Sequence, residues 1–324
     1  MNRPVNVLAA EHRALAEAAR DLLASGPDWT ALVRQGWLDE NLSPAALALL
    51  AEESGAVLLP QPWLVTAAVA PWHRGSPAAL AVSGTATGSA RLHGRVRVPW
   101  PGPDGVLLVP GSALFAVRCR DADPRFLSTM DPTRPLAEVT LEDTPAERVA
   151  GLDVLPGLRC RYRTLAACEA LGVARAALRL ATEHAKNRTQ FGRAIGGFQA
   201  VSHPLSDVYA EIETAAELVP RALPALDGES AGEPPLTALL AGGRGARRRP
   251  PARGPPGGGA RGGGPPPPPS AAAHATEAAV QTLGAQGFLA DHPIAALYRR
   301  AQSFAEPGLH DELAGLVLDE NSRH

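Results

Sequence analysis

Hydrophobic and polar residues follow a helical period at both ends of the chain and a strand period between them. Near the N-terminus, apolar residues recur every three or four positions in three stretches, residues 12–26, 29–42 and 43–55. The third stretch opens with Ser43 and Pro44, residue types that are favoured at the N-cap and at the first helical position. The pattern therefore predicts an N-terminal helical domain.

Shorter runs fill the middle of the chain, and they are either apolar or alternate between apolar and polar residues. They are separated by Gly, Pro and Asp, and they cover residues 90–100, 105–111, 112–119 and 136–143. Runs of this length between turn-forming residues are typical of β-strands. The middle of the chain is therefore predicted to form a small β domain.

Helical periodicity returns in two long stretches, residues 163–187 and 202–223. Hydrophobic residues make up 45% of the chain but aromatic residues only 4%, and this alanine-rich composition favours closely packed helices. The predicted fold is α+β and mainly α. It consists of an N-terminal helical domain (1–75), a middle β domain (76–155) and a C-terminal helical bundle (156–324).

One segment fits neither period. Every residue from 241 to 269 is Ala, Gly, Arg or Pro, the four amino acids whose codons can consist entirely of G and C. An alanine-rich helix encoded in GC-rich DNA and read one base out of frame would give this composition. We hypothesise a local frameshift that replaces a helix, and the alternative is a genuine Pro/Gly linker. Resequencing the gene separates the two, because only a frameshift would leave an unbroken alanine-rich frame.

Charge and cysteine content exclude several classes of protein. A net charge of −2 argues against a general nucleic-acid role. No run of about 18 apolar residues exists to span a membrane, and charged residues from Glu11 onward interrupt any signal peptide. Cys119, Cys160 and Cys168 have no metal-ligand spacing, so no metal site is predicted. We expect a cytoplasmic protein with reduced thiols.

Residues 187–199 read NRTQFGRAIGGFQ and directly follow a predicted helix. Arg188 is at the end of that helix, where its charge suits the helix dipole, and a guanidinium can hold a phosphate with two hydrogen bonds. Gln190 adds a neutral hydrogen-bonding group, Phe191 offers a flat surface for a ring, and Gly192 lets the backbone turn. The alternative is an ordinary corner between two helices.

This motif lies within residues 169–208, which resemble the signature helices of the acyl-CoA dehydrogenase family. The resemblance extends to DPTRPLAEVTLED (131–143) and to AAVQTLGAQGFLADHPIAALYRRA (278–301), in the same order along the chain. It implies an N-terminal helical domain, a middle β-barrel and a C-terminal four-helix bundle. It also implies FAD bound between the subunits of a dimer or tetramer.

The resemblance assigns cofactor contacts to residues on both sides of such an interface. It implies that the pyrophosphate and adenine side of FAD contacts Arg188, Gln190 and Phe191, that Gln199 lies beside the same cofactor, and that the neighbouring subunit's FAD contacts Gln281 and Gly284. It implies α,β-dehydrogenation of an acyl-CoA thioester in lipid metabolism, with electrons leaving to an electron-transfer flavoprotein. A glutamate removes the α-proton while the flavin accepts the β-hydride.

The catalytic glutamate is where this sequence departs from the family pattern. The usual position, about nine residues after the Tyr-Arg pair that ends at Arg299, falls on Gly308, and Glu306 two residues earlier is the candidate base. Another family arrangement places the base near the start of the long helix, where Tyr162 stands here. Glu169, two turns further along that helix, is interpreted as a surface or interhelical residue.

The β domain also departs from the family, since the usual Thr-Glu-Pro and Trp-Ile-Thr segments facing the flavin have no counterpart in residues 81–100. Asp131 and Arg134 in the DPTR segment are interpreted as a pair that stabilises a turn. Two alternatives to a working dehydrogenase therefore stay open. One is a non-catalytic or half-site subunit that clasps FAD in a heteromer with a related chain, and the other is a frameshifted product without a stable fold.

Overall fold

The computed structural model describes residues 5–60, 62–73, 75–227 and 271–305. The N-terminal part forms four helices: α1 (Val5–Ala24), α2 (Trp29–Arg34), α3 (Pro44–Ala56) and α4 (Trp63–Val69). The predicted cap of α3 is confirmed, because the Ala46 amide donates to the Ser43 hydroxyl at 3.2 Å. The fully buried Trp63 packs edge-on against Trp37 and donates its indole N–H to the Trp37 carbonyl at 2.9 Å.

The middle strands form two open four-stranded sheets where the family resemblance implied a small barrel. One sheet has the order β1 (Ala78–Leu80), β4 (Val106–Pro110), β5 (Leu114–Arg118), β8 (Glu147–Ala150). The other has the order β2 (Ser83–Gly88), β3 (Arg91–Pro99), β7 (Leu136–Pro145), β6 (Asp123–Leu127). Within the described residues, neither sheet closes on itself.

The two sheets pack face to face through alternating apolar side chains. Leu92, Val96 and Val98 of β3 share one buried cluster with Leu107 of β4 and Phe115 of β5. The other face of the β1–β4–β5–β8 sheet packs against the helices, since the cluster that contains Leu80, Leu108 and Leu114 also contains side chains of α3, α4 and α5. The outer face of the β2–β3–β7–β6 sheet is left polar, as the alternation along β3 requires.

Among the described residues, the C-terminal part packs four helices around a second buried cluster: α5 (Leu155–Asn187), α6 (Gln199–Ala216), α9 (Ala271–Leu283) and α10 (Pro293–Ala305). A short helix α7 (Val219–Ala222) follows α6, and strands β9 (Thr189–Gln190) and β10 (Arg193–Ala194) form a hairpin after α5. Single 3₁₀ turns lie at η1 (Cys119–Asp121), η2 (Leu152–Val154), η3 (Ile195–Gly197), η4 (Leu223–Leu226) and η5 (Gly284–Phe288). The structure is thus α+β and mainly α, as predicted.

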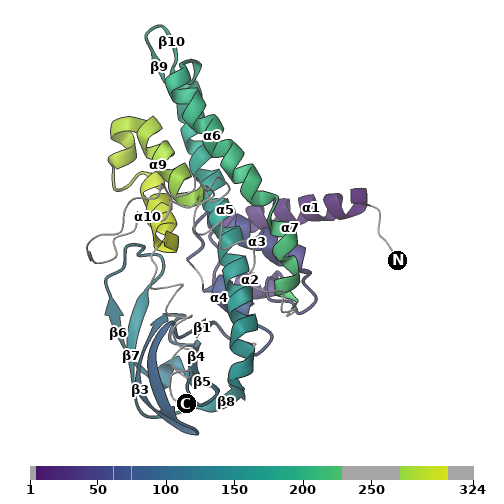
Figure 1. Cartoon of the computed structure of the whole chain (residues 1–324), viewed down its shortest axis with the longest axis vertical. Coiled ribbons are helices and arrows are strands. Elements are labelled where there is room, and N and C mark those ends of the chain that lie inside the picture. The colour runs from purple at the N-terminus through teal and green to yellow at the C-terminus, as the bar shows by residue number, and fades with distance from the viewer. Residues whose placement is uncertain (1–4, 61, 74, 228–270, 306–324) are drawn as a thin grey trace, which may run out of the picture.

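Helix α5 is the central element, and it contacts both the N-terminal helices and the bundle (Figure 1). Its crossing with α3 is close because glycines face the partner backbone on both helices. A Cβ at Gly172 would lie 1.8 Å from the Glu52 carbonyl oxygen, and one at Gly55 would lie 2.1 Å from the Glu169 carbonyl oxygen. This close contact fixes the position of Glu169 along α5 relative to the N-terminal helices.

Figure 1 shows the β9–β10 hairpin at one end of the molecule and the two sheets at the opposite end. Residues 241–269 lie outside the described residues, so the frameshift and linker hypotheses stay predictions.

Candidate active-site pocket

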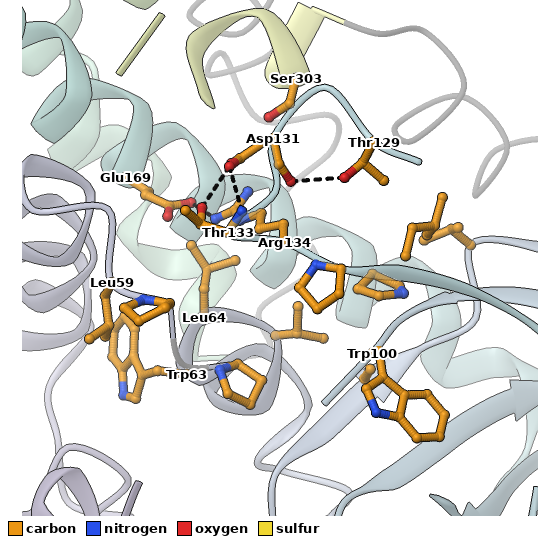
Figure 2. A pocket seen from close by; sticks show the side chains of 18 of the residues that line it. Leu59, Trp63, Leu64, Trp100, Thr129, Asp131, Thr133, Arg134, Glu169 and Ser303 are labelled. Atoms are coloured by element: carbon orange, nitrogen blue, oxygen red, sulfur yellow. Dashed lines mark hydrogen bonds and ion pairs between the residues drawn. The ribbon is translucent and has the colours of Figure 1, made fainter. Parts of the chain in front are cut away.

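A pocket of about 520 Å³ lies where the N-terminal helices, the sheets, α5 and α10 meet. This volume is within the ~300–1,000 Å³ typical of small-molecule sites. Its walls are mostly apolar, and Figure 2 shows Leu59, Trp63 and Leu64 on one side and Trp100 on the other. One end is polar and is lined by Asp131, Thr133, Arg134, Tyr162, Glu169 and Ser303.

Four charged side chains form a cluster at this polar end: Asp131, Arg134, Glu169 and Arg300. Arg300 of α10 is fully buried and donates to a Glu169 oxygen at 2.5 Å, to the Thr133 hydroxyl at 2.6 Å and to the Asp131 carboxylate. Arg134 binds the other Glu169 oxygen. Two cations therefore neutralise two carboxylates, and each Glu169 oxygen already has an arginine partner.

Burial and pairing act on these groups in opposite directions. Burial opposes ionisation of Asp131, but the charge of Arg300 and hydrogen bonds from Thr133 outweigh it and hold the pKa of Asp131 below its ordinary value. Burial, aided by the nearby charge of Arg134, lowers the pKa of Arg300. A buried ion pair of this kind is costly to break, because the charge left behind has no partner.

The cluster corrects one interpretation and refines another. Asp131 was predicted to pair with Arg134 in a turn; the Arg134 amide does donate to the Asp131 carbonyl at 3.1 Å, but the side chains bind Arg300 and Glu169 instead. Glu169 is an interhelical residue as expected, and it also lines the pocket. Tyr162, at the alternative position of the base, lines the pocket too, and burial raises the pKa of its phenol.

The predicted FAD contacts on the hairpin lie at the end of the molecule opposite the sheets (Figure 1), and none of them lines the pocket. Arg188, Gln190 and Phe191 are exposed, and the Phe191 side chain is 92% exposed. Phe191 and Gly192 form the two-residue turn between the strands with φ of 53° and 78°, the positive values that suit a tight hairpin. The Phe198 ring packs edge-on against Phe191 with 6.1 Å between ring centroids.

The remaining predicted contacts lie outside the pocket as well. Gln199 is exposed at the start of α6, and Gln281 is exposed in the last turns of α9. Gly284 follows α9 with a φ of 60°, a conformation that favours glycine. None of the predicted cofactor residues lines the pocket, so the structure does not bring them together with it in one chain.

Glu306, the predicted base, lies outside the described residues. Ser303, three positions earlier on α10, lines the pocket, and the described part of α10 ends at Ala305.

Sequence reasoning missed the charge cluster, although a signal for it was present. Glu169 stands in the run LAACEALG, where every neighbour is apolar, and Arg300 lies on an otherwise amphipathic stretch. A lone charge within a helix that is buried on all sides requires a partner of opposite sign. That argument predicts a buried ion pair but cannot say which of the many arginines supplies it.

Comparisons with known proteins relate the chain to acyl-CoA dehydrogenases. The model of the acyl-CoA dehydrogenase C-terminal domain matches residues 158–240. The acyl-CoA dehydrogenase IpdE2 of Mycobacterium tuberculosis (strain ATCC 25618 / H37Rv) is 35% identical over 181 residues, which are 54% of this chain and 55% of that protein. The acyl-CoA dehydrogenase FadE34 of the same strain is 35% identical over 129 residues, 37% of this chain and 17% of that protein.

The chain is related to acyl-CoA dehydrogenases over residues 158–240 and over the part that aligns with IpdE2. It spans about half the length of the curated IpdE2 relatives that it matches. Two solved structures share the fold over nearly the whole chain. A variant of the Tcur3481–Tcur3483 steroid ACAD has a TM-score of 0.70 at 21% identity, covering 97% of this chain and 99% of that one. The ChsE4–ChsE5 complex from Mycobacterium tuberculosis has a TM-score of 0.71 at 17% identity, covering 97% of both chains.

Two further findings concern only the described part of the chain. No helix there is long and apolar enough to cross a membrane. No group of three or more His, Cys, Asp or Glu side chains there is arranged to hold a metal ion.

Proposed function

We propose that this chain belongs to the acyl-CoA dehydrogenase family and takes part in FAD-dependent α,β-dehydrogenation of an acyl-CoA thioester. The observation that carries the proposal is the apolar pocket between the sheets and α5, with Ser303 at its polar end three residues before the candidate base Glu306. Apolar walls suit an acyl chain, and a polar end suits the thioester, where the proton must be removed.

The pocket also fits the ring system of a flavin. Trp100 offers a flat surface, and Ser128 and Thr129 add hydroxyl groups to the lining. FAD, when bound, would accept the hydride, because no protein side chain can do so. The chain's own residues would orient the ligands and exclude water from them.

The position of the hairpin supports a cofactor shared between chains. Arg188, Gln190 and Phe191 are exposed at the end of the molecule opposite the sheets, so a flavin in the pocket would need the hairpin of another chain (Figure 1). Arg188 and Arg193 are both exposed at the hairpin, where their positive charges suit an anion. We propose a homo-oligomer or a heteromer with a related chain, with an electron-transfer flavoprotein as electron acceptor.

Glu306 is the proposed base, and the geometry argues against Glu169 in that role. Both Glu169 oxygens are held by arginines, so accepting a proton from a ligand would require breaking a buried ion pair. The cytoplasm remains the proposed location, in keeping with three cysteines that form no disulfide in the described part of the chain.

The second candidate function is a half-site subunit that supplies the FAD clasp to a related chain. The observation that favours it is Arg97, which lines the pocket on a sheet where the family's flavin-facing Trp-Ile-Thr segment is missing. The two related solved structures are also described by pairs of chains, Tcur3481–Tcur3483 and ChsE4–ChsE5.

The visible absorption spectrum of the purified protein, normalised to protein concentration, distinguishes these functions. About one oxidised flavin per chain would support the first, and about half would indicate a shared site. Soluble protein without flavin would favour the half-site subunit, and co-expression with a related chain would then be expected to restore flavin.

Activity tests the base. Turnover of an acyl-CoA with an artificial electron acceptor should disappear in Glu306→Gln. The matched control is Glu277→Gln, which changes an exposed glutamate of α9 and should leave turnover unchanged. Full activity in Glu306→Gln would mean that another group is the base.

A further inference from the structure

The outer face of the β2–β3–β7–β6 sheet carries three arginines next to the pocket, Arg95, Arg97 and Arg125. Arg97 of β3 and Arg125 of β6 both pair in register with Glu138 of β7. The side chains of Arg97, Glu138 and Arg125 therefore stand on the same face in one row across the sheet. Arg95 stands one step along β3 in the next row, about 7 Å away. In the opposite direction, Pro99 and Leu136 form the row that lines the pocket.

All three guanidinium groups converge on one carboxylate. Arg125 hydrogen-bonds Glu138 at 2.8 Å, whereas Arg97 and Arg95 lie 3.8 and 3.9 Å from its oxygens. The hydrogen bond and the charges of the arginines hold the pKa of Glu138 below its ordinary value, so it carries one negative charge. Three cations thus surround a single anion.

The balance of charge differs from that of the other ionic groups nearby. In the buried cluster two arginines face two carboxylates, and at the far end of β3 Arg91 pairs with Asp143 at 2.8 Å. The other acidic side chain beside the arginine patch, Asp123, is one row further from the pocket and makes no ion pair within the described part of the chain. The patch of Arg95, Arg97 and Arg125 therefore retains excess positive charge.

Arg95 and Arg97 also retain unused hydrogen-bond donors. Their side chains are 67% and 52% exposed, and neither guanidinium donates a hydrogen bond to the described residues. Each guanidinium carries five N–H donors in a planar fork that matches a phosphate group. Thr85 and Ser83 of β2 pair in register with Arg95 and Arg97 and place two hydroxyl groups in the same rows.

We propose that Arg95 and Arg97, supported by Arg125, bind the diphosphate group of the ligand that occupies the adjacent pocket. Arg97 joins the two regions, because it lines the pocket and belongs to the patch. A second anion beside Glu138 relieves the repulsion among the three cations, and it takes the donors that Glu138 leaves unused. The proposal rests on the proposed function in naming the ligand, since both FAD and a CoA thioester carry a diphosphate.

The test compares Arg95→Gln/Arg97→Gln with the wild-type full chain. Arg125 is kept so that Glu138 retains its partner, and Arg91→Gln on the same strand is the matched control. Flavin per chain is measured by absorbance, and binding of CoA and of inorganic pyrophosphate by calorimetry at low ionic strength. We expect the double variant to lose flavin or to bind CoA at least tenfold more weakly, and the control to stay within twofold.

The two arms identify the source of the diphosphate: loss of flavin indicates FAD, and loss of CoA affinity indicates the thioester. The inference is overturned if the double variant keeps both its flavin and its CoA affinity, which leaves the proposed function intact. If the wild-type chain holds no flavin and binds no CoA, the proposed function fails. The binding of inorganic pyrophosphate then tests the arginine patch on its own. Pyrophosphate binding that weakens tenfold in the double variant upholds the patch, and any other result refutes it.

Discussion

A guanidinium nitrogen of Arg300 on α10 lies 2.5 Å from a carboxylate oxygen of Glu169 on α5, and both side chains are almost completely buried. This contact joins two bundle helices at the polar end of the pocket. Because Arg300 also binds Asp131 of the loop before β7, one side chain holds the bundle to the β domain.

Replacing Arg300 with Met should destabilise the protein strongly, because Glu169 and Asp131 would lose a buried partner. We expect a loss of about 3–5 kcal/mol in the free energy of unfolding, measured by urea denaturation. Arg20→Met is the control: Arg20 pairs with Glu53 but is 62% exposed, so its loss should cost about 0–1 kcal/mol. Equal losses in the two variants would contradict the assigned role of Arg300.

The pH dependence of stability should show the contribution of Asp131. Its pKa is lowered in the folded state, so its stabilising effect is present above its unfolded value of about 3.9 and is lost as the pH falls through the folded value. The difference in melting temperature between wild type and Asp131→Asn should be constant from pH 7 to 5. It should narrow below about pH 4, and a difference that widens on acidification would refute this assignment.

Gly172→Ala should separate α3 from α5. The new Cβ would meet the Glu52 carbonyl oxygen at 1.8 Å, and overpacking of this kind costs about 1–3 kcal/mol. Gly157→Ala in the same helix is the control, because its Cβ would meet nothing within 4 Å and alanine is the better helix former. Thermal melting should show Gly172→Ala below wild type and Gly157→Ala at or above it, and two variants that melt alike would rule out the close crossing.

Phe191→Gly separates a role in binding from a role in folding. Phe191 has a φ of 53° and a side chain that is 92% exposed, so glycine relieves backbone strain and removes little packing. The melting temperature should stay the same or rise, while the flavin bound per chain should fall. Unchanged flavin content would show that this ring does not contact the cofactor.

Much of the fold could be predicted from local sequence. Ser43 and Pro44 mark the start of α3, and alternation along β3 separates Leu92, Val96 and Val98 from the arginines between them. The boundaries were less predictable: α5 begins at Leu155, eight residues before the periodic stretch, because both the N-terminal helices and the sheet cover its first turns. The buried residues of those turns include Arg161, a charged residue that interrupts an apolar period.

The site could be predicted only in part, for reasons of distance along the chain. The hairpin motif is local, so Phe191 and Gly192 could be placed in a turn from sequence alone. The pocket is assembled from Trp63, Trp100, Arg134 and Glu169, which no spacing rule connects. The partners of Arg300 lie 131 and 169 positions away, and only the packing of three parts of the chain brings them together.

Helix α5 is continuous, so its length sets the distance between the two places where ligand contacts are proposed. Its 33 residues span about 50 Å and carry Glu169 at the pocket and Arg188 just beyond the last turn. Each residue of a helix adds about 100° of rotation. Inserting or deleting a single residue between Glu169 and Arg188 would therefore rotate the hairpin by about 100° around the axis of α5. In the proposed assembly, the reach of this chain's hairpin into a neighbouring pocket would therefore depend on both the length and the rotation of α5.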